Sequence, residues 1–326
     1  MSNSVELIEP VSTFAPAPDK MLERSRCINC ASSHFEVLSS GHYRDDPVRG
    51  FIAADPWGES PLPYLHDETW RFVRCWDCRQ MFHQRILTPA WQERLYRDWV
   101  TDAAMREFET LHGVSSPSTK WNNGRDCVRH LLRVEKLTRE LRAEQPLRVL
   151  DFGCGWGQFL AAAAVFGAEA YGIDRDADRL LQARASGVTV APSLADLPRA
   201  VRGQVDSISL FQVLEHLEEP RPVLEELRDW LRPGGVLILE VPDCTGTTGF
   251  NSEADYQAIN PLAHINAFTP ETLIGIARRA GYVPLDYVPA YVTVDLLAVG
   301  KSALKGLLSP LESKLRPATA RYFRCG

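Results

Sequence analysis

Arg148-Val-Leu-Asp-Phe-Gly-Cys-Gly-Trp-Gly-Gln-Phe-Leu160 is the stretch that decides the fold of this chain. A short apolar run leads into Asp151, glycines follow at positions 153, 155 and 157, and an alanine-rich helical sequence comes next. Glycine accepts positive φ angles and carries no side chain, so backbone N–H groups in such a turn can approach a ligand at a helix N-terminus. The pattern therefore predicts a strand, a tight glycine turn and a helix that together bind a ligand.

A second predicted strand, over residues 169–174, ends in Asp174, which follows Gly157 by 17 residues. An acid at such a strand tip can accept hydrogen bonds from both ribose hydroxyls of a nucleoside ligand. A dinucleotide-binding turn has the spacing G-x-G-x-x-G, whereas this turn reads G-x-G-x-G and follows an acid two residues before its first glycine. A Rossmann-like sheet that binds no cofactor is the plainer alternative.

Two later motifs follow the glycine turn in order. Residues 206–217 read DSISLFQVLEHL, and residues 231–242 read LRPGGVLILEVP. The glycine turn resembles the first motif of class I S-adenosylmethionine (SAM) methyltransferases, V-L-D-x-G-C-G-x-G. The two later motifs resemble that family's fourth strand with the turn after it, and its L-x-P-G-G turn with the fifth strand. The resemblance covers residues 120–300 and implies SAM as the cofactor.

Strands and helices alternate regularly along the sequence, which predicts a doubly wound parallel sheet. Strands are predicted at 148–152, 169–174, 188–191, 206–211 and 235–241, and the resemblance adds a closing hairpin from 282–288 and 291–299. The expected fold is α/β, a Rossmann-like seven-stranded sheet, as the resemblance implies. Two C-x-x-C pairs, Cys27/Cys30 and Cys75/Cys78, predict a small zinc-ribbon-like module before it. The predicted organisation is a tail (1–20), a metal-binding module (21–87), a helical linker or lid (88–145), the methyltransferase domain (146–300) and a C-terminal helix and tail (301–326).

The resemblance also implies a cofactor site. Asp151 and the turn over Gly153, Cys154, Gly155 and Gly157 would hold the amino-acid end of SAM, with Cys154 as a small packing residue within the turn. Asp174 would bind the ribose. The remaining expected contacts are Ser193 and Leu194 at adenine, with Asp196 as a substitute for the family's usual acid, Phe211 and Gln212 at the methionine part, and Trp121 and Asn122 in the lid.

Eight cysteines include two C-x-x-C pairs, Cys27/Cys30 and Cys75/Cys78, which are separated by residues 31–74. Two-residue spacing lets both thiolates of a pair reach one ion, and two pairs complete a tetrahedral site that suits structural Zn²⁺. Buried or redox-active thiols are the alternative. The Pro- and Gly-rich insertion between the pairs is either ordered or mobile.

Two histidines are candidate general bases, because imidazole accepts a proton near neutral pH. His216 follows the fourth predicted strand, and His264 lies in the H-x-x-x-F-T sequence of residues 264–269. Glu215, Tyr256 and Asp243 are further pocket candidates. A four-cysteine module joined to this motif resembles a subset of sugar-nucleotide methyltransferases, which implies a sugar or natural-product acceptor. The sequence ends without the large C-terminal domain of the C-methylating members, so the acceptor atom stays open between O, N and C.

Composition narrows the remaining functions. The formal net charge of −6 does not favour broad nucleic-acid binding, and no apolar run is long enough to span a membrane. Without a basic, apolar leader, a cytoplasmic protein is expected. The alternatives are an RNA or protein methyltransferase that docks through the metal module, for which Arg71, Arg74, Arg79 and Arg85 are the only support, and a non-catalytic SAM-binding scaffold.

Overall fold

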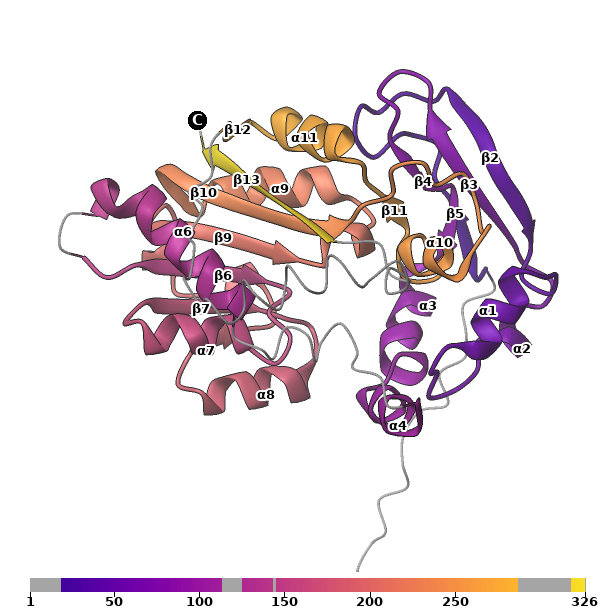
Figure 1. Ribbon diagram of the computed structural model, residues 1–326, viewed down its shortest axis with the longest axis horizontal. Helices are drawn as coiled ribbons and strands as arrows, with labels where there is room; N and C mark the ends of the chain where they lie inside the picture. Colours follow the sequence, from indigo (N-terminus) through magenta and orange to yellow (C-terminus); the bar gives the residue numbers. More distant parts are fainter. Residues whose placement is uncertain (1–18, 113–124, 143–144, 287–317, 326) are drawn as a thin grey trace, which may run out of the picture.

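The computed structural model describes residues 19–112, 125–142, 145–286 and 318–325. Its main body is a seven-stranded sheet, and a smaller four-stranded sheet lies beside it (Figure 1). None of the helices in these ranges is both long and apolar enough to cross a lipid bilayer.

The large sheet has the strand order β12-β13-β10-β9-β6-β7-β8. Neighbouring strands from β10 through β9, β6 and β7 to β8 pair in parallel. Every residue of β9 except the last is buried, as expected for a parallel strand covered on both faces. The predicted Rossmann-like α/β sheet is confirmed. The strands are β6 (Arg148–Phe152), β7 (Glu169–Ile173), β8 (Thr189–Ala191), β9 (Val205–Phe211), β10 (Leu231–Pro242), β12 (Tyr282–Pro284) and β13 (Ala318–Cys325).

Helices cover both faces of this sheet, because neighbouring residues of each strand point to opposite sides. Val149 packs with residues of α6, α7 and α8, whereas Leu150 packs with residues of α9 and α11. The helices are α6 (Arg125–Arg142), α7 (Gln158–Val165), α8 (Ala177–Ala185), α9 (Pro220–Arg228) and α11 (Pro270–Arg279).

The closing strand of the sheet differs from the prediction. β10 pairs antiparallel with β13 from Val236↔Arg324 to Pro242↔Ala318, and β13 in turn pairs with β12. The prediction of a C-terminal helix and tail over 301–326 is therefore wrong for residues 318–325, because these residues form a strand inside the sheet. The expected strand at 291–299 falls outside the described residues, as do Trp121 and Asn122.

The small sheet has the order β11-β4-β3-β2, and β11 comes from the second half of the chain. Asn266 and Ala267 pair with Phe82 and Met81 of β4, so the N-terminal module is completed by a strand far away in sequence. A separate ribbon pairs β1 with β5. The strands are β1 (Met21–Glu23), β2 (Phe35–His42), β3 (Thr69–Cys75), β4 (Met81–His83), β5 (Arg85–Leu87) and β11 (Asn266–Ala267).

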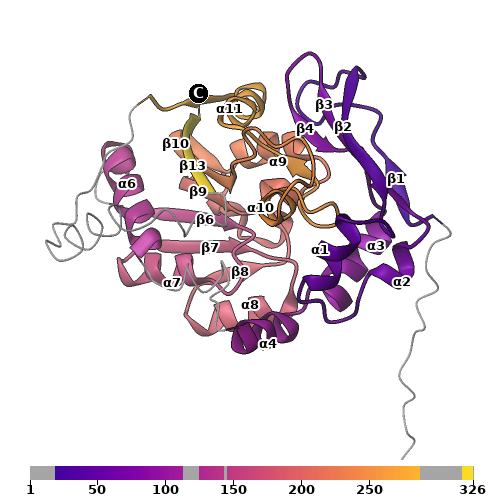
Figure 2. The same ribbon diagram turned by 45° about the vertical axis from the view of Figure 1, so that its right-hand side comes forward.

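The insertion at 31–74 is folded. It contributes β2, the short helices α1 and α2, and most of β3. α1 packs against α10, which lies between the two sheets in both views (Figures 1 and 2). Trp70 of β3 shares one apolar core with Phe250 and Tyr256, so this core contains residues of both the module and the later chain. The remaining helices are α1 (Val48–Ala54), α2 (Leu62–Leu65), α3 (Pro89–Arg94), a π-helix (Leu95–Trp99), α4 (Asp102–His112) and α10 (Glu253–Ala258).

Candidate active site

The glycine turn follows β6 and adopts the predicted conformation. Gly153, Gly155 and Gly157 all have positive φ, at 80°, 52° and 77°. A Cβ atom on Gly153 would lie 2.4 Å from Cγ2 of Val213, and one on Gly157 would lie 2.8 Å from Cβ of Ala183. A Cβ atom on Gly155 would meet nothing within 4 Å, so the middle of the turn faces open space. The turn is thus tightly packed at both ends and open where a ligand would approach.

Asp174 lies at the tip of β7 and already accepts two backbone hydrogen bonds. Its Oδ2 accepts the N–H of Gly155 at 2.8 Å, and its Oδ1 accepts the N–H of Asp176 at 2.9 Å. A carboxylate has about four acceptor positions, so acceptor capacity remains on both oxygens. The carboxylate therefore ties the turn to β7 and can still bind hydroxyl donors.

Asp151 is buried at the end of β6, and its neighbour is a neutral hydroxyl. Ser209 Oγ donates to Oδ1 of Asp151 at 2.6 Å. Burial raises the pKa of Asp151 to about 7, and the nearby negative charge of Asp174 adds to the rise, while the Ser209 hydrogen bond opposes it. A cationic ligand group beside Asp151 would offset this cost of burying a carboxylate.

The predicted adenine contacts lie in a short 3-10 helix after β8. Leu194 is buried in the sheet core, so its side chain packs inward. Ser193 Oγ donates to Oδ2 of Asp196 at 2.6 Å, which joins the two polar candidates into one group. Cys154, in the glycine turn, is buried under Gly172, where a Cβ would lie 2.8 Å from its Sγ.

Phe211 and Gln212 end β9 beside the glycine turn. The ring of Phe211 lies 5.2 Å from Phe159 of α7 and 5.0 Å from His130 of α6. Gln212 has a φ of 57°, and its N–H donates to the carbonyl of Glu240 at 2.8 Å. This left-handed residue turns the chain sharply out of the sheet toward His216.

The two candidate bases, far apart in sequence, lie together. The rings of His216 and His264 are 4.9 Å apart at 66°. Nδ1 of His216 lies 2.8 Å from the carbonyl of Ala263, which can only accept, so Nδ1 carries the proton. Nε2 of neutral His216 is therefore the proton acceptor. Burial lowers the pKa of His216 below its ordinary value and that of His264 to about 3.

Glu215 lies next to this pair and is the most deeply buried acid of the group. Its carboxylate oxygens have no hydrogen-bonding partner in the described part of the chain, and burial raises its pKa to about 8. Oε1 lies 4.0 Å from Nε2 of His216. One carboxylate oxygen of Glu215 and one ring nitrogen each of His216 and His264 lie within 4.8 Å of one another, close enough to act on one bound group.

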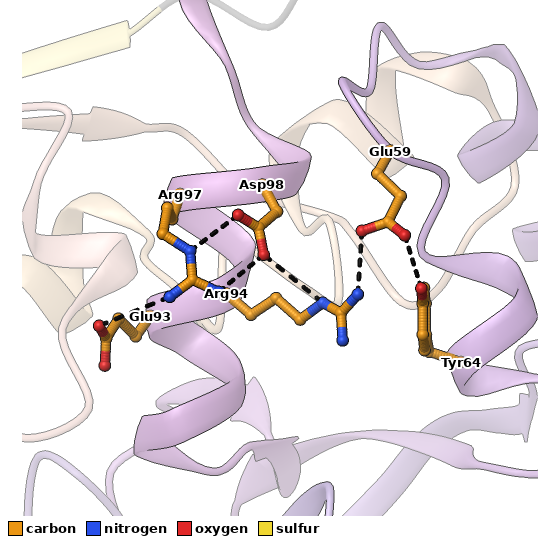
Figure 3. A network of polar contacts seen from close by, with 6 residues as sticks. All are labelled: Glu59, Tyr64, Glu93, Arg94, Arg97 and Asp98. Atoms are coloured by element: carbon orange, nitrogen blue, oxygen red, sulfur yellow. Dashed lines mark hydrogen bonds and ion pairs between the residues drawn. The ribbon is translucent and has the colours of Figure 1, made fainter. Parts of the chain in front are cut away.

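A π-helix, which the sequence did not predict, brings Tyr96 to the same place. Tyr96 is 47 % exposed, and its ring meets that of His216 edge to face at 6.4 Å. Figure 3 shows how the segment is fixed: Arg94 binds Glu59 at 3.0 Å and lies 3.7 Å from Asp98. π-helices are often found at functional sites, but no periodicity in the sequence marks this one.

Helix α4 contacts α8 beside the glycine turn. Asp102 of α4 forms an ion pair with Arg179 of α8 at 3.1 Å, and the Arg179 guanidinium lies 5.8 Å from the ring centre of Trp156. α4 and α8 lie side by side in Figure 2. The segment after residue 88 therefore borders the region that we expect to bind the cofactor.

The four paired cysteines cluster with the geometry of two metal knuckles. Sγ of Cys27 lies 3.5 Å from Sγ of Cys78, Sγ of Cys30 lies 3.5 Å from Sγ of Cys75, and all four sulfur atoms lie within 4.8 Å of one another. Thiolates bound to tetrahedral zinc at about 2.3 Å would be about 3.8 Å apart. The residue after each pair has positive φ: 62° at Ala31 and 64° at Arg79. The donor set and its spacing fit zinc, whose presence stays a prediction.

The arginines near the knuckles are mostly paired. Arg71 binds Glu23, Arg74 binds Glu36, and Arg85 binds Glu68. These ion pairs neutralise much of the basic character that would suit a nucleic-acid surface.

Comparisons with known proteins agree on one family. A family model described as a methyltransferase domain matches residues 126–287. The ubiquinone biosynthesis O-methyltransferase of Ruegeria pomeroyi is 30 % identical over 205 residues, which cover 57 % of this chain and 81 % of the relative. The protein of the same name from Cereibacter sphaeroides is 28 % identical over 201 residues, with the same two coverages.

A solved structure from Mesorhizobium loti, a SAM-dependent methyltransferase, is also similar. It is 19 % identical and has a TM-score of 0.41, with 59 % of this chain and 97 % of that chain covered. That likeness adds no functional information.

Proposed function

The chain belongs to the SAM-dependent methyltransferases, and from that premise we propose that it transfers a methyl group to a hydroxyl oxygen of a small-molecule acceptor. Two relatives are named as O-methyltransferases, which supports oxygen as the acceptor atom. The acceptor class that we propose is a sugar, free or nucleotide-linked, or a natural-product intermediate.

SAM supplies an electrophilic methyl group on a positively charged sulfur. We assign its carboxylate to N–H groups of the turn over residues 153–157, because such groups at a helix N-terminus favour anions. Asp151 offsets the ammonium group, and Asp174 accepts from the ribose hydroxyls with its remaining capacity. Ser193 and Leu194 border adenine, and Phe211 and Gln212 border the methionine part.

The tautomer of His216 carries the proposal. A hydroxyl is a weak nucleophile until its proton leaves. The Ala263 carbonyl fixes the proton of His216 on Nδ1, so the lone pair of Nε2 is the one that can accept another proton. In the transfer, the acceptor oxygen forms the new C–O bond, the C–S bond breaks with its electron pair left on sulfur, and the hydroxyl proton passes to Nε2. His264 packs against this ring and is the second candidate base.

For the four-cysteine cluster we propose structural zinc. Four thiolates fill a tetrahedral site, which leaves no open position for chemistry. A role in docking RNA or protein gains no support from the neighbouring arginines, since Arg71, Arg74 and Arg85 are paired with glutamates.

The test uses SAM labelled with ¹³C in its methyl group, offered with phenolic, sugar and amine acceptors. Nuclear magnetic resonance of the product then identifies the methylated atom. We expect a methyl ether, and His216→Asn should lower kcat on the order of 10²- to 10⁴-fold with unchanged SAM affinity. His66→Asn, at an exposed histidine, is the control. Methylation of nitrogen or carbon, or normal turnover by His216→Asn, would contradict the proposal.

A further inference from the structure

Arg24 is a buried cation at the junction of the small sheet and the active-site loops. It lies three residues before Cys27 and is only 6 % exposed. Burial lowers the pKa of its guanidinium to about 9, against the opposing effect of Glu218 and Glu219. A buried charge is costly to maintain unless its hydrogen bonds are well satisfied.

All hydrogen bonds of Arg24 go to neutral oxygens. Nε and Nη2 donate to the carbonyl of His83 at 3.0 and 2.5 Å, and Nη2 also donates to the carbonyl of Ile265 at 2.6 Å. Nη1 donates to Oδ1 of Asn266 at 2.8 Å. The planar guanidinium thus fixes β4 of the module against the two residues that follow His264.

Asn266 extends this link to the other histidine. Its Nδ2 donates to the carbonyls of Leu214, at 3.2 Å, and Leu217, at 2.6 Å. These two residues flank Glu215 and His216 in the chain. One amide side chain therefore joins the guanidinium of Arg24 to the short helix that carries the proposed base.

His83 completes the frame from the module side. Its N–H donates to the carbonyl of Ile265 at 2.9 Å, and its Nε2 donates to the carbonyl of Ile259 at 2.8 Å. The loop over residues 259–266, which carries His264 and the Ala263 carbonyl, is therefore held at both ends by residues of the module. The Arg24 guanidinium contacts the Ile265 carbonyl of this loop and also Asn266, whose amide group holds the His216 helix.

We propose that Arg24 is a positioning residue for methyl transfer: its guanidinium sets the relative position of the loops that carry His216 and His264. The proposal rests on the proposed function, because it assigns a purpose to the placement of these histidines. The cysteine knuckle that begins at Cys27 anchors the backbone from which Arg24 extends, so the module supports the acceptor site through this side chain.

The test compares Arg24→Met and Arg24→Lys with Arg26→Met in the full-length protein. Methionine keeps the bulk without the donors, and lysine keeps the charge but cannot form the planar fork. Arg26 is exposed, lies two residues away and precedes the same knuckle, which makes it a matched control. Hydrogen–deuterium exchange of residues 213–217 and 259–268 is measured with metal content, the Kd of SAM, and kcat and KM for the acceptor.

We expect both Arg24 variants to exchange faster in the two segments and to lose kcat on the order of 10- to 100-fold, with zinc content and SAM Kd unchanged. If Arg24→Met does not fold, the same comparison is made with Arg24→Lys alone. Unchanged exchange, unchanged kcat, or a kcat loss matched by lost zinc or lost SAM binding would overturn the proposal. If His216→Asn keeps normal turnover, the proposed function fails, whereas faster exchange in the Arg24 variants would still establish the link between the loops.

Discussion

At the scale of single residues, the site combines buried acids with neutral neighbours. Asp151 is paired with the Ser209 hydroxyl, and Glu215 has no hydrogen-bonding partner within the described ranges. The sequence predicted Asp151 and Asp174 because their places in the motif are local. Tyr96 and Arg24 could not be predicted, since one depends on a π-helix and the other on contacts across 241 and 242 residues.

The affinity for SAM should rise with pH through the pKa of Asp151. The free protein holds this carboxyl with a pKa of about 7, and an ammonium group beside it favours the ionised form. Protonation therefore competes with binding below pH 7 and ceases to do so above it. Calorimetric titrations should show Kd falling about tenfold from pH 6 to pH 8.

Asp151→Asn is the matched variant for this prediction, because it keeps the shape and removes the titration. The tenfold fall in Kd between pH 6 and pH 8 should be absent in this variant. An identical pH dependence in the two proteins would mean that another group, such as Glu215, governs the effect.

At the scale of elements, the local patterns predicted the parallel strands to within a few residues at each end. Each is a short apolar run next to its turn and helix, so the evidence lies in neighbouring residues. β13 was missed because Ala-Thr-Ala-Arg-Tyr-Phe-Arg-Cys carries two arginines and resembles a basic tail. Its pairing with β10 joins residues about 80 apart in the chain, and sequence periodicity does not report such contacts.

The glycine turn permits a steric test with an internal control. Gly153→Ala places a Cβ 2.4 Å from Val213 at a φ of 80°, whereas Gly167→Ala has the same φ and no atom within 4 Å. A left-handed alanine costs about 1–2 kcal/mol, and overpacking adds about 1–3 kcal/mol. Urea unfolding should therefore show that Gly153→Ala has a free energy of unfolding lower than that of Gly167→Ala by the overpacking cost. Equal losses of unfolding free energy in the two variants would exclude the clash.

At the scale of the whole molecule, the module and the methyltransferase sheet form one structure. Cys27 and Cys75 lie in the same apolar core as Leu210 and Leu273, and β11 completes the small sheet. The spacing of the cysteines predicted their clustering. It could not predict that residues 266 and 267 would pair with β4, because the register depends on the assembled fold.

Cys75→Ser should remove the metal and weaken this shared core. We expect one zinc per chain in the wild-type protein by elemental analysis, much less in Cys75→Ser, and lower thermal stability in that variant, because a structural zinc site contributes directly to folding. Cys127→Ser, at a buried cysteine outside the cluster, should keep its zinc. Full zinc content in Cys75→Ser would refute the four-cysteine site.

The most direct test of the account is the titration of SAM into the wild-type protein, Asp174→Ala and Asp178→Ala by calorimetry. Asp174 joins the glycine turn to β7. Asp178 lies four residues later, in the first turn of α8, and its side chain is exposed. We predict saturable binding of one SAM per chain, unchanged in Asp178→Ala and weaker by about 2–3 kcal/mol in Asp174→Ala, as expected for lost hydrogen bonds to a charged group. Equal affinity in all three proteins would contradict the assignment of the cofactor to this edge of the sheet.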